Sequence, residues 1–511
     1  MADISSNNKR IVKNTAFLYV RMIFIMAVSL YTSRIILEAL GVEDYGIYNI
    51  VGGIVSMFGF INASLSGASS RFIIYSLGEG DKIKSQEIFN SIMTTHYIIA
   101  AVVVILAETA GLWFVMNKLV IPDERLTAAF WVYQSTVLSS IIMLVSSPFN
   151  ALIIAHEKMN AFALISVIEA VLKLFSVFVL FVLPIDRLVI YAILTVTVQV
   201  FIRILYTIYC KKHFSESHYH LRFKVDGMKS ILMYSAWTMN GNLAIVGSTQ
   251  GINILFNLFF GPIVNAAYGI ALQVQSACNQ FCSNFLMAVR PQIIKSYAQD
   301  DLSHMHQLIL FSTRYSFYLT LLIAVPIISQ ADYILKIWLV DVPPYTVEFV
   351  QFMLVVALNT SLNGSVLIGI HATGDLKKFQ MIEGTILLSV VPVSYVLLKY
   401  FNVGAIAVFF TYLIIEVITQ LIRIWIVFPK IRLAIRYYYT QIMWPIFKVS
   451  AVVWIIPYFL KRNLSEGTFS SFIVIVSAAA FSVLLSVVLL GISKNELSFV
   501  VEKLKYVLRK K

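Results

Sequence analysis

Charged side chains inside long apolar segments are the residues of this sequence that could do chemistry. Glu169 and Lys173 lie four positions apart in the segment 160–183, with the acidic residue first, a spacing that favours an ion pair on one helix face. Arg21, in the segment 14–38, has no acidic residue one helical turn away, so it needs a partner on another helix, a water-filled cavity or a route to the interface. Because a carboxylate at membrane depth can take up a proton or a sodium ion, the acidic residues are candidates for ion coupling: Glu108, Glu169, Glu383 and Glu416.

Two further spacings bring opposite charges together along a helix. Arg34 and Glu38 are spaced for an ion pair, and Glu416 and Arg423 lie two turns apart on roughly one face. Glu383 has no lysine four positions further on, so it lacks the local partner that Glu169 has. A packed, neutralised pair and an ion-coupling group are both consistent with these patterns.

Arginines at two corresponding positions could bind an anion. Arg71 is followed ten residues later by Asp81, and Arg290 is followed ten residues later by Asp300. Two guanidinium groups facing one cavity would hold a diphosphate through paired hydrogen bonds. Ordinary anchoring of basic residues at the cytoplasmic surface is the competing interpretation.

Amide side chains recur along the segments 229–258 and 264–288. Amides bind sugar hydroxyls, so these polar faces suit helices that line a wet cavity, whereas hydrogen bonding between helices is the alternative. The candidates for a polar cavity lining are Asn240, Asn242, Gln250, Asn253, Gln273 and Asn279.

The sequence has no motif of a catalytic or metal site. It contains neither the phosphate-binding loop G-x-x-x-x-G-K-[ST] nor the zinc motif H-E-x-x-H, and Cys278 and Cys282 have no histidine at metal spacing. We therefore expect no enzyme, no cofactor and no use of ATP by this chain alone. A gradient of H⁺ or Na⁺, or a downhill substrate, would drive any transport.

The elements that must position these residues are membrane helices. A hydrophobic fraction of 59% with 13% charged residues cannot cover a soluble protein of 511 residues. About 20 apolar residues cross a bilayer as a helix, so the sequence predicts an all-α integral membrane protein of about 14 transmembrane helices, without a soluble domain. The predicted segments are 14–38, 46–68, 90–115, 127–152, 160–183, 188–210, 229–258, 264–288, 305–328, 346–370, 378–399, 404–428, 441–460 and 468–491.

The positions of the lysines and arginines predict the orientation. They concentrate in alternate loops and at both ends of the chain, which places both termini in the cytoplasm by the positive-inside rule. The net charge of +13 then reflects topology and contact with anionic membrane lipids. Nucleic acid is excluded as a partner, since no basic soluble module exists to bind it.

The chain repeats itself at an offset near 220 residues. Leu40-Gly41 matches Phe260-Gly261, the stretch beginning at Arg71 matches the stretch beginning at Arg290, and Glu169 matches Glu383. Six helices followed by six related helices of the same orientation form a parallel repeat. We therefore predict an N-terminal lobe, 1–213, a C-terminal lobe, 214–436, and two extra helices with a basic cytoplasmic tail, 437–511.

Three segments resemble a known family. They are LEALGVEDYGIYNIVGGIVSMFGFINASLSGASSRF (37–72), NALIIAHEKMNAFA (150–163) and AVRPQIIKSYAQDD (288–301). They resemble the polysaccharide-transport branch of the MATE-like, or MOP, superfamily, the Wzx-type flippases of O-antigen and capsule synthesis. The resemblance extends over essentially the whole chain, including the helix count and the six-plus-six repeat.

The resemblance implies two six-helix bundles arranged as a V, with two helices appended. It implies a protein of the bacterial inner membrane that moves an undecaprenyl-diphosphate-linked oligosaccharide from the cytoplasmic to the periplasmic leaflet by alternating access, coupled to H⁺ or Na⁺. A polysaccharide polymerase and glycosyltransferases would be its partners. Family cavities are cationic, which assigns substrate binding, by position and charge alone, to Arg21, Arg34, Arg71, Lys173, Arg290 and Arg314.

Other functions remain open at this stage. A peptidoglycan-precursor (lipid II) flippase and a cation-coupled multidrug exporter belong to the same superfamily, and the exporter would bind organic cations. A chain of a different class would be an inert scaffold of a glycan-polymerising complex. The excess of basic over acidic residues in the predicted helices favours an anionic substrate.

Overall fold

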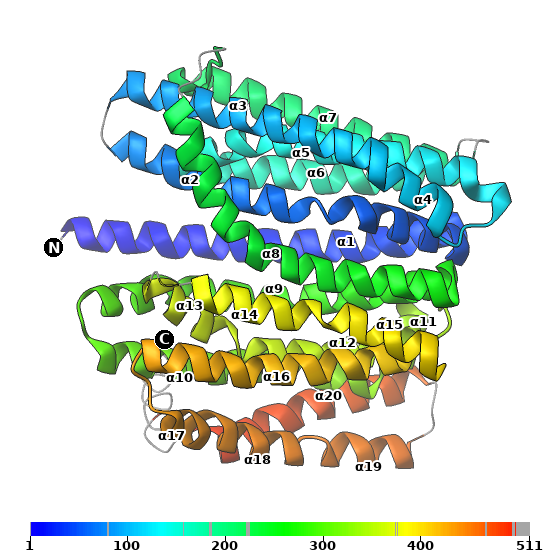
Figure 1. Ribbon diagram of the computed structural model, residues 1–511. Coiled ribbons are helices and arrows are strands. Elements are labelled where there is room, and N and C mark those ends of the chain that lie inside the picture. The colour runs from blue at the N-terminus through cyan, green and yellow to red at the C-terminus, as the bar shows by residue number, and fades with distance from the viewer. Residues whose placement is uncertain are drawn as a thin grey trace. The chain divides into compact units, whose positions relative to one another are not determined.

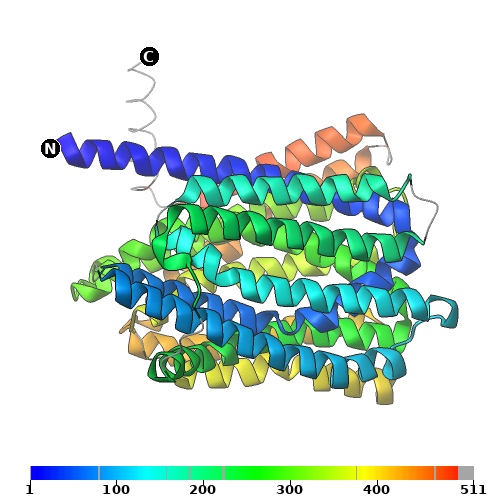
Figure 2. The same cartoon turned by 90° about the horizontal axis from the view of Figure 1, so that it is seen from above.

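The computed structural model describes residues 2–78, 81–156, 158–182, 186–220, 225–373, 375, 377–464, 468–492 and 496. Side chains are described from Met22 on, except at 71, 75, 159, 225–227, 230, 234, 237, 238, 240, 287, 288, 291, 295 and 298. Over these ranges the chain is helical and has no strand, which confirms the predicted all-α class (Figures 1 and 2).

Each predicted membrane segment falls on one or two helices. The longer helices are α1 (Ala2–Ser56), α2 (Gly59–Gly78), α3 (Lys82–Leu106), α5 (Leu126–Ala155), α6 (Met159–Val179), α7 (Arg187–His213), α8 (Val225–Phe260), α9 (Pro262–Ala298), α10 (Leu302–Ser329), α12 (Thr346–Ser361), α13 (Gly364–Thr373), α14 (Lys377–Leu388), α15 (Val390–Phe401), α16 (Ile406–Lys430), α18 (Trp444–Val452), α19 (Ile455–Asn463) and α20 (Phe469–Ser486). The shorter α4 (Leu112–Lys118), α11 (Ala331–Trp338) and α17 (Ile435–Tyr438) lie between them.

Twelve helical segments of the described chain are long and apolar enough to cross a membrane. The predicted segment 46–68 falls across the end of α1 and the start of α2, and 264–288 falls on α9. Neither α2 nor α9 is among the twelve, although both are helical. Serine recurs along α2, and serine, asparagine and glutamine recur along α9, which lowers the hydropathy of both helices.

Two glycines with left-handed backbone end long helices at positions that the predicted repeat pairs. Gly41, with φ of 77°, interrupts α1, and Gly261, with φ of 80°, separates α8 from α9. Residues with a side chain rarely adopt this conformation, so glycine is required at both breaks. These are the glycines of the matched pairs Leu40-Gly41 and Phe260-Gly261.

The described chain packs as two compact units. Unit 1 comprises 1–269, 338–344 and 384–408, and unit 2 comprises 270–337, 345–383 and 409–511. In unit 1, α5 packs against α1, α2, α3 and α7. In unit 2, α10 packs against α12, α13 and α20. The lobe boundaries inferred from the sequence stay a prediction.

A proline interrupts the hydrogen bonding inside α5, near its C-terminal end. Pro148 has no backbone N–H, so the carbonyl of Leu144 loses its partner within the helix. The Nδ1 of His96 on α3 lies 2.7 Å from this carbonyl, and because a carbonyl only accepts, Nδ1 carries the proton. Arg203 on α7 donates to the next carbonyl, that of Val145, at 2.7 Å. Two side chains thus satisfy the backbone around the proline.

Candidate functional site

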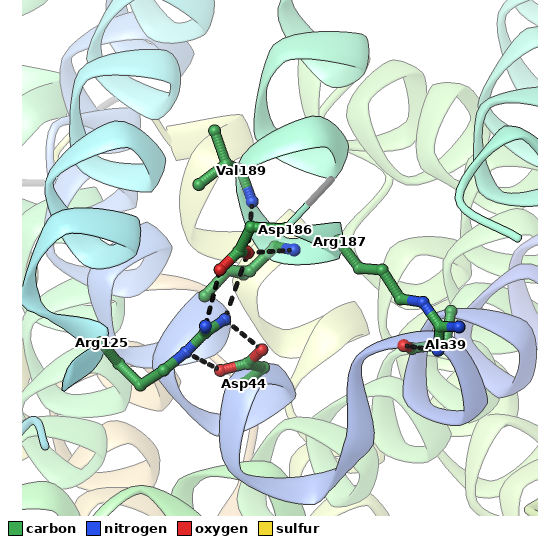
Figure 3. A network of polar contacts seen from close by, with 7 residues as sticks. Ala39, Asp44, Arg125, Asp186, Arg187 and Val189 are labelled. Carbon is green, nitrogen blue, oxygen red and sulfur yellow. Dashed lines mark hydrogen bonds and ion pairs between the residues drawn. The ribbon is translucent and has the colours of Figure 1, made fainter. Parts of the chain in front are cut away.

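An arginine clamped by two carboxylates joins three helix ends in unit 1. Arg125, just before α5, donates from Nε to Asp44 at 2.8 Å and from Nη1 to Asp186 at 2.6 Å, and its Nη2 also contacts Asp44 (Figure 3). Asp44 follows the break at Gly41, and Asp186 precedes α7. Charge-assisted pairs of this kind are stronger than neutral hydrogen bonds, so the cluster fixes how α1, α5 and α7 meet.

The same cluster completes the hydrogen bonding of two helix ends. Asp186 is the N-cap of α7 and accepts from the backbone N–H groups of Leu188 and Val189. Arg187 donates to the carbonyl of Ala39, just before the break in α1, at 3.0 Å (Figure 3). Burial raises the pKa of Asp186, but the hydrogen bonds from Arg125 and the two backbone N–H groups outweigh it and hold that pKa below its usual value.

This cluster was not predicted from the sequence. In the sequence, Arg125 and Arg187 lie in short stretches between predicted membrane segments. An aspartate directly before the apolar run of α7 is an N-cap signal that could have pointed to Asp186, but nothing local links it to Asp44.

The predicted pair on α6 is formed. Lys173 donates to Glu169 at 2.6 Å, and Gln199 on α7 lies 3.4 Å from the same carboxylate oxygen. The Lys173 side chain is 45% exposed, so the ammonium lies at the surface of the protein fold. The spacing-based prediction of an ion pair is confirmed, while its role in transport stays a prediction.

Glu108 lies in a widened turn that continues α3. The π-helical turn Ala107–Gly111 presents its carboxylate to Gln134 on α5, whose amide donates at 3.0 Å. The carbonyl of Ala107 accepts from the hydroxyl of the buried Tyr133 at 2.6 Å. A π-turn is frequent at functional sites, and here it aims a half-buried carboxylate between two helices.

The amides of α8 hydrogen-bond to other helices of unit 1. Asn253, 4% exposed, donates to the carbonyl of Asn49 on α1 and accepts from Asn265 on α9 at 2.7 Å. Gln250 accepts from Asn253, and Asn242 donates to Ser64 on α2 at 3.1 Å. The contacts of Asn253 with α1 and α9 and of Asn242 with α2 are the interhelical bonding that the sequence left open as the alternative to a cavity lining, whereas the contact between Gln250 and Asn253 lies within α8.

Unit 2 contains a buried charge cluster between α14, α16 and α17. Arg423 donates from Nε to Glu383 at 3.1 Å, contacts the same oxygen through Nη2, and donates from Nη1 to Gln420 at 2.6 Å. Gln420 in turn donates to the hydroxyl of Tyr438 at 2.9 Å. Glu383, which has no lysine one turn away on its own helix, therefore has its counterion on another helix, α16. Glu416 is 4% exposed, and its Oε2 has no hydrogen-bond partner in the described part of the chain.

Arg314, a predicted substrate ligand on α10, has an acidic partner. It forms an ion pair with Glu496, and its Nη1 lies 3.5 Å from the carbonyl of Gln441 in a π-helical turn. The guanidinium also lies 5.6 Å from the ring centre of Tyr315. Arg314 thus links α10 to the turn that precedes α18, through Gln441, and to Glu496, which follows α20.

The remaining candidates divide by their exposure. Arg290 is exposed on α9, Arg34 is partly buried on α1, and Gln273 and Asn279 are partly buried on α9. The side chains of three candidates lie outside the described residues: Arg21, Arg71 and Asn240. Whether the cationic and amide candidates share one cavity stays a prediction.

A histidine and a glutamate hold the connection after α7. His156, at the end of α5, lies 2.5 Å from Glu216 and stacks on Phe214 with ring centres 4.1 Å apart. Burial raises the pKa of Glu216, but its backbone hydrogen bond and the contact with His156 outweigh it and lower that pKa. Among the described residues, no group of three or more His, Cys, Asp or Glu is arranged to hold a metal.

Comparisons with solved structures identify the fold. A MATE protein in complex with MaD3S is 15% identical, with a TM-score of 0.58, over 82% of this chain and 96% of that chain. An inward-facing multidrug resistance MATE family transporter of the MOP superfamily is 13% identical, with a TM-score of 0.59, over 79% and 98%. A MOP superfamily transporter from Pyrococcus furiosus is 13% identical, with a TM-score of 0.58, over 82% and 96%. A search of the curated proteins finds no match.

The helical fold is thus that of the solved MOP superfamily structures, and twelve segments of the described chain are long and apolar enough to cross a membrane. A family model described as "Polysaccharide biosynthesis protein" matches residues 11–297. The chain belongs to this family, that of the Wzx-type flippases, which confirms the resemblance found in the sequence.

Proposed function

We propose that the protein is a flippase that moves an undecaprenyl-diphosphate-linked oligosaccharide from the cytoplasmic to the periplasmic leaflet of a bacterial inner membrane. The family match over residues 11–297 carries this proposal, because it joins polysaccharide synthesis to a transporter fold. Moving a diphosphate and sugars unaided through hydrocarbon is prohibitively costly. A polar path inside the protein removes that cost while the polyprenyl chain stays in lipid.

Alternating access driven by a gradient of H⁺ or Na⁺ is the proposed mechanism. The carboxylates proposed to bind the coupling ion are Glu108, Glu169, Glu383 and Glu416. Two observations support a role for these acids: the carboxylate of Glu108 projects from a π-turn, and Oε2 of Glu416 lacks a hydrogen-bond partner in the described chain. The proposed orientation has both termini in the cytoplasm, where glycosyltransferases would supply the substrate. A polymerase would consume the product on the other side.

Among the basic candidates, Arg290 is the strongest for binding the diphosphate. It is exposed, and it occupies the position that matches Arg71 in the repeat. Lys173 and Arg314 are engaged with Glu169 and Glu496, so binding a substrate would require those pairs to open. Arg21, Arg34 and Arg71 keep their proposed roles by position and charge.

The test is surface-glycan display in a deletion strain complemented with wild type, Arg21→Ala or Arg290→Ala at matched expression. We expect loss of display and accumulation of cytoplasm-facing lipid-linked units in both variants. Lys212→Ala is the matched control, since Lys212 is an exposed basic residue at the end of α7 without a proposed role. We expect normal display with this control.

Three outcomes would contradict the proposal. Normal glycan in a deletion strain that has no second flippase, together with new sensitivity to cationic drugs, would indicate a multidrug exporter. Arrested peptidoglycan synthesis with intact surface glycan would indicate a peptidoglycan-precursor flippase. Full activity of all charge-to-alanine variants would indicate a scaffold.

A further inference from the structure

Among the described residues, the charges buried between α14, α16 and α17 do not balance. The cluster contains two carboxylates, Glu383 and Glu416, and one guanidinium, that of Arg423. Glu416 and Arg423 are 4% and 3% exposed, so water does not solvate the charge of either side chain. If all three were ionised, one negative charge would remain in the protein interior, which is costly.

The hydrogen bonds show which carboxylate has the counterion. Arg423 directs Nε and Nη2 to Glu383 and Nη1 to Gln420. Gln420 is held in place by Tyr438 from α17. Glu416 shares the face of α16 with Arg423, seven residues earlier, but the described chain offers no partner to its buried Oε2.

We propose that Glu416 is a proton-binding site and is a neutral acid in this conformation. One proton from water converts its carboxylate to a carboxylic acid, which removes the unbalanced charge and leaves Arg423 with Glu383. The charged groups that act on Glu416 in the described chain are Arg423 on its own helix and Glu383 on α14, with the hydroxyl of Tyr412 one turn away. Tyr438 from α17 reaches the cluster through Gln420.

A proton suits this site better than a sodium ion. Hard cations require several oxygen ligands, whereas Glu383 Oε1 and Gln420 Oε1 already accept from Arg423. The guanidinium would also repel a cation bound beside it. A proton requires only the one carboxylate oxygen that is left without a partner.

The course of the chain connects this site to conformational change, a step that rests on the proposed function. Residues 345–383 are one of the stretches that make up unit 2, and Glu383 is the last of them. Helix α14 continues without interruption past Glu383 into Gly384–Leu388, which belong to unit 1. A displacement of unit 1 would therefore pull on Glu383 through a helix. Once Glu383 leaves Arg423, the freed guanidinium stabilises the ionised form of Glu416, and the proton is released.

The test is infrared spectroscopy of the purified protein in detergent at neutral pH, without substrate. The C=O stretch of a protonated carboxylic acid should be present in wild type and completely lost in Glu416→Gln. It should also be lost in Glu383→Gln, where Arg423 is free to stabilise an ionised Glu416. Asp332→Asn, which alters an exposed acid paired with Lys336, should retain the band.

Folding serves as the second measurement. Because glutamine has the shape of a neutral glutamic acid, Glu416→Gln should unfold at the temperature of wild type. An unchanged band in Glu416→Gln, or failure of this variant to fold, would overturn the proposal. Since neither measurement involves transport, the proton site could stand if the flippase assignment failed, and the reverse also holds. In proteoliposomes, Glu416→Gln should bind lipid-linked saccharide and lose stimulation by a pH gradient.

Discussion

The imidazole of His96 donates to the carbonyl of Leu144, the group that Pro148 deprives of its partner within α5. The two atoms lie 2.7 Å apart, and His96 is fully buried. A polar residue of α3 thus stabilises a proline inside α5. No local pattern in the sequence connects His96 with Leu144, which lies 48 positions further on.

The first prediction is a rescue of one variant by another. His96→Ala leaves the Leu144 carbonyl buried and unpaired, which should cost about 1–3 kcal/mol in the free energy of unfolding. Pro148→Ala supplies an N–H to that carbonyl, so the double variant should lose less stability than the two single losses combined. Denaturant titration in detergent measures the cycle. Strict additivity would show that the contact does not stabilise the proline.

The second prediction concerns the clamped arginine of unit 1. Arg125→Met removes the partner of both Asp44 and Asp186, and because these side chains are partly exposed, the loss should be about 1–3 kcal/mol. Arg125→Lys should recover only part of it, since an ammonium cannot reach two carboxylates as a planar fork does.

An exposed ion pair provides the comparison for this clamp. Lys336 and Asp332 on α11 are 64% and 61% exposed, so Lys336→Met should change stability by about 0–1 kcal/mol. Thermal unfolding of both variants in one detergent makes the comparison. Equal losses would contradict a structural role for the Arg125 cluster.

The third prediction is a pH dependence with a defined sign. The pKa of Asp186 is lowered in the folded state, so its contribution to stability is complete above the ordinary value of 3.8 and is lost as pH falls through the folded-state pKa. In Asp186→Asn the loss of stability that comes from protonating Asp186 at low pH should be absent. Unfolding temperatures of wild type and Asp186→Asn should therefore differ at neutral pH and converge in strong acid. A constant difference at every pH would refute the assignment.

Local spacing made part of the site predictable. Glu169 and Lys173 are one turn apart on one helix, and the ion pair could be read from the sequence because helix geometry alone brings them together. The breaks at Gly41 and Gly261 were visible as matching dipeptides for a similar reason: a left-handed backbone needs glycine.

The other ion pairs of the candidate site depend on tertiary packing, which the sequence does not show. Glu383 and Arg423 are separated by 40 positions, and Asp44 and Arg125 by 81, so nothing in the sequence pairs them. The all-α class follows from apolar length, which is a property of each segment, whereas α2 and α9 are helices of lower hydropathy and are not among the twelve apolar segments. Which polar faces meet depends on how the helices pack, and that depends on many weak contacts together.

The last prediction compares two ion pairs that differ in burial. Arg423→Met leaves Glu383 without its counterion in a site where the arginine is 3% and the carboxylate 15% exposed, so the loss should be about 3 kcal/mol or more. Lys173→Met leaves Glu169 26% exposed and still near Gln199, so about 0–1 kcal/mol is expected. Both variants replace a cation by the same apolar side chain on a membrane helix, which makes them matched. Denaturant titration in one detergent gives the two values. Similar losses would mean that burial of the Arg423–Glu383 pair does not set its contribution, and that the cluster between α14, α16 and α17 is no more constrained than the exposed pair on α6.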